Sequence, residues 1–310
     1  MKVHYNIDTY KNIKNPVITV GTFDGVHIGH QTIINKINRI AKRCNGESVL
    51  LTFEPHPRKV ILNDSSSLKL INSINEKITL LEKYKLDHLV IHPFTKEFSR
   101  ISPTAYVRDL LVNQLNAYHL VIGYDHQFGR NREGDLELLI ELSNVYGFKI
   151  DEISAQEIDA IKISSTKIRN AISSGDILKT NTYLGHPFSL EGKVIEGDKI
   201  GRTIGFPTAN IDITDFDKIR PANGVYAVKV HVNGCSYLGM MNIGTRPTFN
   251  KKENYTSYEV NIFNFSENIY NRKIKVEFFF KIRDEKKFDD INALKLQLID
   301  DKKKSIEHLA

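Results

Sequence analysis

The sequence has few cysteines and no long apolar segment. Cys44 and Cys235 are the two cysteines among 310 residues, one in each half of the chain. Two thiols are too few for a disulfide framework or a cysteine-ligated structural zinc site, so we expect both to be reduced. No stretch is apolar enough to span a bilayer, and the start, MKVHYNIDTYKN, lacks the apolar core of a signal peptide. The sequence therefore predicts a cytoplasmic protein without a membrane partner.

A nucleic-acid-binding motif and a long basic run are also missing. The net charge of +6 is the difference between 43 Lys and Arg and 37 Asp and Glu, and the nearest approach to a basic run is 302–304. This mild excess suits a protein that handles phosphates, but it is weak evidence for nucleic-acid binding. We expect small-molecule substrates, no nucleic-acid partner, and a monomer or weak homo-oligomer. A flavin- or nucleotide-responsive regulator that binds nucleic acid stays open as an alternative.

The first half of the chain alternates β-rich runs with segments of helical periodicity. The expected strands are 17–20, 48–53, 88–92, 119–122 and 149–153. This alternation is typical of a doubly wound α/β fold with a parallel sheet. Because ligands of such sheets bind beyond the carboxyl ends of the strands, we expect the chemistry in the loops that follow Val20, Phe53 and Ile122.

The pattern changes near residue 180, and the second half is typical of antiparallel β structure. Asn233-Gly234 is a dipeptide favoured in hairpin turns. Apolar residues occupy every second position of 274–282, and a helical pattern returns at 289–299. Since 310 residues exceed the size at which one core usually keeps growing, we expect two domains, 1–180 and 181–310. The second should be a mainly antiparallel β-barrel or sandwich closed by a C-terminal helix.

The segment GTFDGVHIGH, residues 21–30, follows the first expected strand and leads into a helix. Glycine lets a backbone approach a phosphate, and a helix N-terminus offers unpaired N–H groups and the positive end of its dipole. His27 and His30 would then donate hydrogen bonds to the α-phosphate of a nucleotide as charge builds there. Two other interpretations remain, ordinary loop histidines or a zinc site, although the spacing differs from that of metalloprotease helices.

Three further segments carry residues that suit a nucleotide. FEPHPR (53–58) and GYDHQFG (123–129) follow the second and fourth expected strands. ISSTKIR (163–169) carries a Ser/Thr helix-cap signal, and Arg169 lies within about the first turn of the expected helix. The helix dipole opposes an arginine near its N-terminus, so a bound phosphate would explain Arg169, whose alternative role is a solvated helix arginine.

Together these motifs resemble the nucleotidyltransferase superfamily, which combines an HxGH motif with a downstream S-S/T-x-x-R segment. FEPHP and the GxD-x-x-FG pattern make this half similar to the FMN adenylyltransferase module of prokaryotic FAD synthetases. The resemblance implies a nucleotidyltransferase-like fold and catalytic roles for His27, His30 and Arg169. It also implies ATP or flavin contacts at Gly21, Phe23, Gly29, Asp125, Phe128, Ser165 and Thr166. One departure is His126, where the family often has an aromatic residue.

The second half contains a glycine-rich segment, GKVIEGDKIGRTIGFPTAN (192–210), which is able to wrap phosphates. Thr208 and Asn210 are two residues apart in an extended run, which projects both side-chain oxygens to one face. Neutral oxygens suit Mg²⁺ when nucleotide phosphates supply the negative charge. Glu259 alternates with apolar residues in 258–262 and is a candidate general base for an alcohol. Purely structural roles for these residues remain the alternative.

GRTIGFPTANI, GVYAV (224–228), NIGTRPTF (242–249) and Glu259 make the second half similar to the riboflavin kinase module. The resemblance implies an ATP-Mg²⁺ site with Glu259 as catalytic base. Its nucleotide contacts are Gly197, Gly201, Gly205, Thr208 and Asn210, of which the last two also hold the metal. The family commonly has E-x-H and a later D-F, where this chain has Asn261 and Asn264.

The two implied reactions need different residues, which agrees with the two motif sets. FMN adenylylation uses a phosphate nucleophile with roughly −1.5 to −2 charge, so that site needs donors and cations but no base. Riboflavin phosphorylation uses an un-ionised hydroxyl, so a positioned carboxylate and Mg²⁺ are useful. The sequence therefore predicts a bifunctional enzyme that makes FMN from riboflavin and FAD from FMN. An adenylyltransferase whose second half has lost kinase activity is the main alternative.

Overall fold

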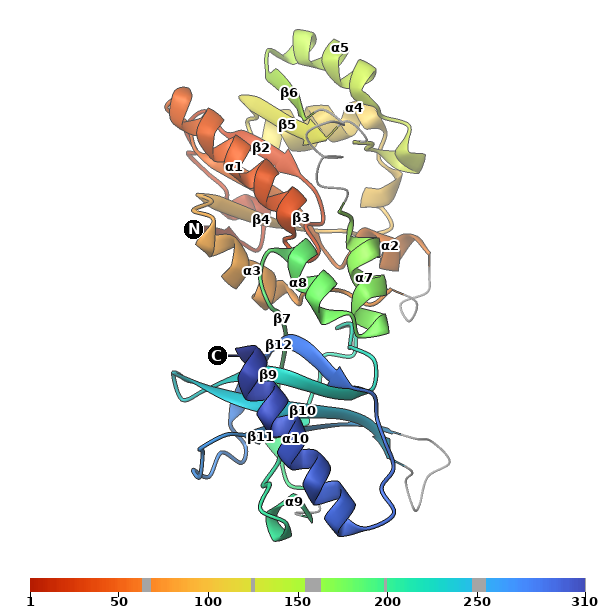
Figure 1. The fold of residues 1–310 in the computed structure, drawn as a ribbon. Helices are drawn as coiled ribbons and strands as arrows, with labels where there is room; N and C mark the ends of the chain where they lie inside the picture. The colour runs from red at the N-terminus through yellow and green to blue at the C-terminus, as the bar shows by residue number, and fades with distance from the viewer. Residues whose placement is uncertain (63–67, 124–125, 154–162, 198–199, 247–254, 310) are drawn as a thin grey trace. The chain divides into compact units, whose positions relative to one another are not determined.

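The computed structural model describes residues 1–62, 68–123, 126–153, 163–197, 200–246 and 255–309. The chain divides into two compact units, Met1–Ser165 and Thr166–Ala310. Each unit has a sheet of its own (Figure 1). Within the described ranges, no helix is long and apolar enough to cross a membrane.

A six-stranded parallel sheet forms the centre of the first unit, in the order β1-β4-β3-β2-β5-β6. The strands are β1 (Lys2–His4), β2 (Val17–Val20), β3 (Ser48–Glu54), β4 (His88–Pro93), β5 (His119–Gly123) and β6 (Lys149–Ile153). The chain adds strands on one side of β2 and then continues on its other side with β5. The loops after β2 and β5 therefore diverge at a topological switch point, where α/β sheets bind ligands.

Helices α1 (Ile28–Arg43) and α3 (Ile74–Lys83) cover one face of this sheet (Figure 1). Successive strand residues point to opposite faces, so Leu50 packs with Ile34, Ile37 and Leu81 on this side. The capping box at Ser73, with Glu76 at its third position, starts α3.

The other face is covered by α5 (Leu136–Tyr146) and by η3 (Tyr106–Gln114), a π-helical segment. Here Val49 and Leu51 pack with Leu110 and Leu139. The short elements of this unit are α2 (Pro57–Ile61), α4 (Pro103–Ala105), η1 (Ile7–Thr9), η2 (Phe98–Arg100) and η4 (Arg130–Arg132). The sheet is thus buried on both faces, which confirms the predicted doubly wound fold.

All five strands predicted for this half are present, each within one residue of its predicted bounds. The edge strand β1 was not predicted. Its three residues, Lys2 to His4, show no apolar alternation, and it is a strand because it pairs in parallel with β4. Tertiary pairing decides such a short edge strand.

A closed six-stranded barrel forms the second unit, in the order β10-β11-β8-β7-β12-β9, and all neighbours are antiparallel. Its strands are β7 (Phe188–Ile195), β8 (Ala209–Asp212), β9 (Gly224–Val232), β10 (Cys235–Arg246), β11 (Tyr255–Ile262) and β12 (Lys273–Arg283). The sequence was compatible with either a barrel or a sandwich, and the structure confirms the barrel. The predicted hairpin turn joins β9 to β10, with Asn233 and Gly234 at φ 52° and 79°.

Burial in β12 follows the apolar alternation only as far as Phe278. Register shifts interrupt its pairing with β9 between Phe278 and Phe280 and between Lys281 and Arg283. Phe278 is fully buried, whereas Phe280 is partly exposed and stacks on His308, with ring centroids 3.8 Å apart. The β-bulges therefore turn the end of the strand toward the C-terminal helix.

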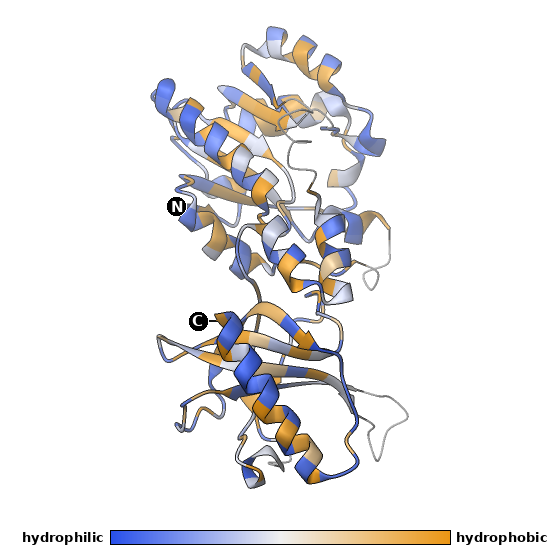
Figure 2. Ribbon diagram, viewed as in Figure 1, coloured by the Kyte–Doolittle hydropathy of each residue, from blue (hydrophilic) through white to orange (hydrophobic). Residues whose placement is uncertain are grey.

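The helices of this part of the chain are α7 (Ser165–Ser174), α8 (Ile177–Leu184), α9 (Ile200–Thr203) and α10 (Ile291–Leu309). Helix α10 confirms the predicted closing helix but extends ten residues beyond 299, and it mixes polar and apolar residues along its length (Figure 2). Fully buried Asp301 anchors it to Arg283 of β12 through bonds of 2.8 to 3.0 Å. The contact division after Ser165 assigns α8 and nearly all of α7 to the second unit, whereas the sequence boundary follows residue 180.

Candidate active sites

The loop between β2 and α1 contains three residues in the left-handed region of backbone conformation. Phe23, Gly25 and Val26 have φ angles of 48°, 93° and 43°. Left-handed backbone is unfavourable for phenylalanine and valine, so the surrounding structure must hold it. The carbonyl of Thr22 accepts hydrogen bonds from Lys77 Nζ at 2.7 Å and Thr52 Oγ1 at 3.2 Å. These bonds fix the loop at the carboxyl end of β2, where the sequence predicted a phosphate-binding turn.

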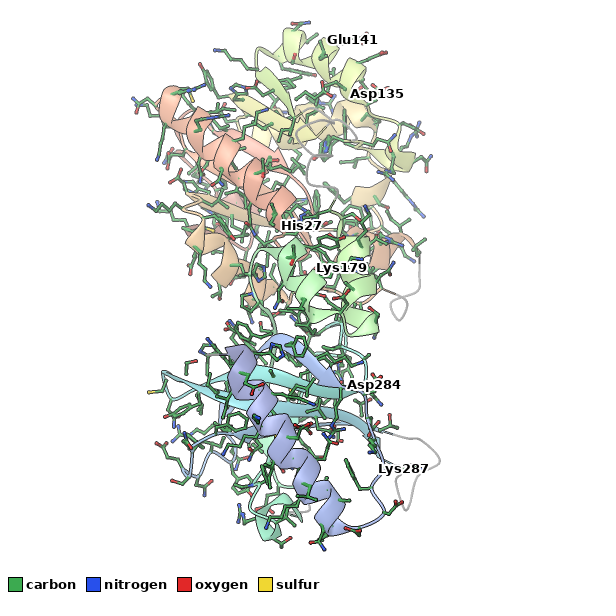
Figure 3. All side chains as sticks on the ribbon, in the orientation of Figure 1. His27, Asp135, Glu141, Lys179, Asp284 and Lys287 are labelled. Atoms are coloured by element: carbon green, nitrogen blue, oxygen red, sulfur yellow. The ribbon has the colours of Figure 1, made fainter. Side chains whose placement is uncertain are left out.

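His27 is the residue that caps helix α1. It is 7% exposed, and its Nδ1 accepts a hydrogen bond from the backbone N–H of His30 at 3.4 Å. Because Nδ1 is an acceptor, a neutral His27 carries its proton on Nε2 and can donate there. A Cβ atom on Gly29 would lie 3.2 Å from His27 Cε1, so glycine leaves room for the ring over the first turn. Figure 3 shows His27 at the beginning of α1.

The ring of His30 lies between the rings of His27 and Phe23. The His27 and His30 centroids are 3.6 Å apart, and those of Phe23 and His30 are 4.5 Å apart. Burial lowers the pKa of His27 to about 4, and burial followed by the charges of His27 and Lys77 holds the pKa of His30 well below its usual range. The Nδ1 atom of His30 is buried without a hydrogen-bond partner among the described residues. Both imidazoles are therefore neutral near pH 7.

Two residues of this site were missed by the sequence analysis. Asp24 is 2% exposed, and its Oδ1 accepts from the backbone N–H groups of Ile71 and Asn72 at 2.9 and 3.2 Å. Lys77 is 6% exposed, and burial lowers its pKa below the usual value. The negative charges of Asp24 and Glu54 oppose this shift without cancelling it. Lys77 belongs to no motif, because only folding brings α3 to a loop more than fifty residues earlier. Asp24 lies within the segment GTFDGVHIGH, but its neighbours in sequence do not indicate its function, because its partners Ile71 and Asn72 are distant in the chain.

The segment ISSTKIR also contacts the loop after β2. Ser165 donates its Oγ proton to the carbonyl of Asp24 at 3.0 Å, across 141 residues. Helix α7 begins at Ser165, as the cap signal predicted, and Ile168 is fully buried. Thr166 is exposed and Arg169 half-buried on this helix. The structure thus joins two of the predicted motifs through Ser165.

The segment after β5 contributes rings to an aromatic cluster. Phe128 is 5% exposed and lies 5.4 Å from the ring of Tyr106 and 5.9 Å from that of His126, with which it is stacked. A Cβ on Gly134 would lie 2.6 Å from the Phe128 ring, so the glycine makes room for that ring. His126, noted as a departure, therefore occupies a stacking position. Asp125 lies outside the described residues.

The barrel brings the residues predicted for the kinase site onto one face. Glu259 of β11 is directly paired with Asn210 of β8 on one side and with Asn242 of β10 on the other. Directly opposite residues of an antiparallel pair project to the same face of the sheet. Thr208 lies just before β8. Glu259 and Asn210 are thus neighbours. Asn242, the first residue of the NIGTRPTF segment, belongs to the same group of side chains, and the sequence did not predict it.

Two glycines of the glycine-rich segment contact the proposed metal ligands. A Cβ on Gly197 would overlap the side-chain amide of Asn210, and one on Gly201 would lie 3.5 Å from Thr208 Oγ1. Gly205 has φ 84°, a conformation that favours glycine. The sequence predicted a glycine-rich turn here, and the structure adds one helical turn, α9, between Gly197 and Gly205.

The two asparagine departures have structural positions of their own. Asn261 is 6% exposed and donates from Nδ2 to the carbonyl of Pro207 at 2.6 Å. Asn264 is exposed at φ 54°, which asparagine tolerates better than most residues. Among the described residues, no group of three or more His, Cys, Asp or Glu side chains is arranged to hold a metal ion.

Comparison with known proteins assigns both units. Residues 9–167 match the family model of FAD synthetase, and residues 184–309 match that of riboflavin kinase. A protein of Buchnera aphidicola subsp. Schizaphis graminum named bifunctional riboflavin kinase/FMN adenylyltransferase is 38% identical, over 97% of this chain and 96% of its own length. A Listeria monocytogenes protein of the same name is 39% identical, over 92% of this chain and 89% of its own. The chain belongs to this family.

A solved structure extends the likeness of this riboflavin kinase/FMN adenylyltransferase family member to the whole fold. The crystal structure, described as a macrolide-efflux protein from Streptococcus pneumoniae, has a TM-score of 0.88 and 30% identity, and the match covers 98% of each chain. The two family models fall on the parallel-sheet unit and on the barrel. The predicted fold class, with a nucleotidyltransferase-like first half and a barrel second half, is confirmed.

Proposed function

We propose that the two family activities depend on two separate sets of side chains, one in the loop after β2 and one on the face of β8 and β11 that carries Asn210 and Glu259. The chain phosphorylates riboflavin to FMN with ATP and adenylylates FMN to FAD. The main support for two separate sites is the direct pairing of Glu259 with Asn210. This pairing puts a carboxylate of the barrel beside a proposed metal-binding oxygen. The loop after β2 instead presents neutral imidazoles at a helix N-terminus.

In adenylylation, a phosphate oxygen of FMN attacks the α-phosphorus of ATP, and the bond to the bridging oxygen of the β-phosphate breaks. Pyrophosphate leaves, and no proton has to be removed from the nucleophile. Nε2 of His27 and the N–H groups at the start of α1 donate to the oxygens of the α-phosphate, where negative charge develops. His30 supports the His27 ring by stacking on it. Ser165 holds the loop, and Thr166 and Arg169 supply further phosphate contacts.

The proposal includes the remaining ligand contacts that the sequence motifs imply for this half. The phosphates would lie along the backbone at Gly21 and Gly29. Phe23 supports the histidine pair by stacking on His30. The flavin lies at the segment that contains Asp125 and Phe128, which follows β5 at the switch point of the sheet. Adjacent loops after β2 and β5 would then hold the two substrates of one transfer.

In phosphorylation, a ribityl hydroxyl of riboflavin attacks the γ-phosphorus of ATP, the bond to the β-phosphate breaks, and ADP leaves. Glu259 accepts the proton of that hydroxyl. Side-chain oxygens of Thr208 and Asn210 are hard neutral ligands and fit Mg²⁺. The backbone N–H groups of Gly197, Gly201 and Gly205 would contact the phosphates. Bound Mg²⁺ would neutralise charge on the β- and γ-phosphates.

The finer assignments form part of the same proposal. The proposed functional domains are 1–180 and 181–310. The ISSTKIR segment serves the adenylylating half, to which Ser165 is joined by its hydrogen bond to Asp24. The protein acts in the cytoplasm as a monomer or weak homo-oligomer. Both assignments are predictions that the composition suggests.

The proposal is tested by incubating the protein with riboflavin, ATP and Mg²⁺ and separating FMN and FAD by chromatography. We expect both products. Glu259→Gln should lower the rate of FMN formation by about 10²- to 10⁴-fold, equivalent to about 3 to 5 kcal/mol in the barrier, and leave the conversion of added FMN to FAD unchanged. The matched control is Glu191→Gln on β7, a half-buried strand glutamate that pairs with Lys273 at 2.6 Å.

If Glu259→Gln and Glu191→Gln form FMN at the same rate, Glu259 is not the base. If the wild type makes FAD from FMN but no FMN from riboflavin, the second half has lost its kinase activity. Salt-dependent binding of an oligonucleotide without any flavin turnover would favour the regulatory alternative instead.

A further inference from the structure

Asn261 makes a short hydrogen bond to the backbone just before the proposed metal ligands. Its Nδ2 donates to the carbonyl of Pro207 at 2.6 Å, and the side chain is 6% exposed. Pro207 immediately precedes Thr208, and Asn261 follows Glu259 by two residues on the same face of β11. One strand therefore carries the proposed base and also holds the segment that carries a proposed metal ligand.

The rest of that segment is fixed at its two ends. The N–H of Phe206 donates to the carbonyl of Gly201 at 2.8 Å, and Asn210 is paired with Glu259 across β8 and β11. Between these points lie Pro207 and Thr208. Proline has no N–H to donate, so the carbonyl of Pro207 is the polar backbone group of this residue that can be tethered. Asn261 supplies that tether from the strand of the base.

We infer that Asn261 is a positioning residue of the kinase reaction, which sets the distance between Glu259 and the Thr208–Asn210 segment. This inference rests on the proposed roles of Glu259, Thr208 and Asn210. Pro207 is itself exposed, so water can replace the lost donor and the barrel loses little stability when the bond is removed. Its loss instead frees Thr208 to move relative to the base.

A purely structural role for Asn261 predicts a different result. A buried amide that only stabilised the barrel would lower the melting temperature and leave the kinetics of the folded fraction unchanged. A positioning role changes the dependence of the folded enzyme on Mg²⁺ and ATP. The two roles are therefore separated by steady-state constants measured well below the melting temperature, with the conversion of FMN to FAD by the same sample as a measure of intact protein.

The test compares four full-length variants. Asn261→Leu and Asn261→Asp keep the approximate size of the side chain and remove the donor. Asn261→His restores a donor, because its Nδ1 lies at the same place along the side chain as Nδ2 of asparagine. The control is Asn181→Leu in the same unit but away from this face. It removes two 2.8 Å hydrogen bonds of the Asn181 amide, one donated to the carbonyl of Phe278 and one accepted from the N–H of Phe188.

We expect Asn261→Leu and Asn261→Asp to raise the KM for ATP-Mg²⁺ and the Mg²⁺ concentration for half-maximal FMN formation by about three- to tenfold, the effect of one net hydrogen bond. The kcat should change less than the KM, and Asn261→His should recover most of the loss. Asn181→Leu should lower the melting temperature without moving either constant.

Unchanged constants in both donor-free variants overturn the inference, and so does failure of Asn261→His to recover when its melting temperature is that of the wild type. If Asn261→Leu does not fold, Asn261→Asp decides the same question. Glu259→Gln is measured in parallel: a normal rate in that variant overturns the proposed base, whereas a low rate there with unchanged Asn261 variants overturns the positioning role alone.

Discussion

Replacing His27 by asparagine would separate its two roles, helix cap and proposed phosphate donor. The Nδ1 of His27 caps the N–H of His30 at 3.4 Å, and asparagine is among the best capping residues because its Oδ1 reaches the same N–H. Its amide does not reach the place of the imidazole Nε2. The variant should therefore keep helix α1 and lose the donor.

The expected magnitude follows from the buried state of His27. With a pKa of about 4, the ring is neutral at pH 7 and has one N–H to offer at Nε2. Removing one preorganised donor to developing charge typically costs about 10² to 10³ in rate, or about 2.7 to 4 kcal/mol. We expect His27→Asn to lower the kcat of FMN-to-FAD conversion by that factor and to leave riboflavin phosphorylation by the same sample unchanged.

The same burial predicts a pH-dependent stability. The folded-state pKa of His27 is about 4, below the 6.5 of the unfolded chain, so the unfolded state takes up a proton first as the pH falls. The contribution of neutral, buried His27 to the free energy of unfolding is present in full above pH 6.5. It declines by about 3 kcal/mol as the pH falls from 6.5 to 4. Urea unfolding at pH 7 and pH 4.5 should show a smaller loss in His27→Asn than in the wild type.

Two results would refute this reasoning. FAD formation by His27→Asn within about threefold of the wild type would show that Nε2 donates to no charge of the transition state. An inflection of the wild-type FAD rate near pH 6.5 that disappears in the variant would show that His27 titrates in its ordinary range, so that burial does not hold it neutral.

Two further predictions concern the barrel. Gly197→Ala places a Cβ on the amide of Asn210, so it should raise the KM for ATP-Mg²⁺ in FMN formation without changing FAD formation from FMN; an unchanged KM would show that Asn210 binds no metal. Arg283→Met leaves fully buried Asp301 without its bidentate partner and should cost about 3 to 5 kcal/mol in the free energy of unfolding measured with urea. The double variant with Asp301→Leu should recover much of this loss, and equal destabilisation of the single and double variants would contradict the argument.

The regular elements were predictable because their signals are local. The strands β2 to β6 are short apolar runs, and the β9–β10 turn has an Asn-Gly pair that adopts positive φ at both residues. Elements without such signals were missed or misjudged. Strand β1 depends on its partner β4, the bulges in β12 depend on β9, and α10 continues to Leu309, past the last residue of the periodic segment.

The sequence alone determined which residue types and motifs the two sites contain, and hence the family to which this chain belongs. Only the tertiary structure decided how those residues act together. It placed Lys77 under the loop after β2, buried His27 and His30 so that both are neutral, paired Glu259 with Asn210, and joined Asn261 to Pro207. Hydrogen bonds and burial between residues distant in the chain leave no local pattern, because they depend on which surfaces meet when the chain folds.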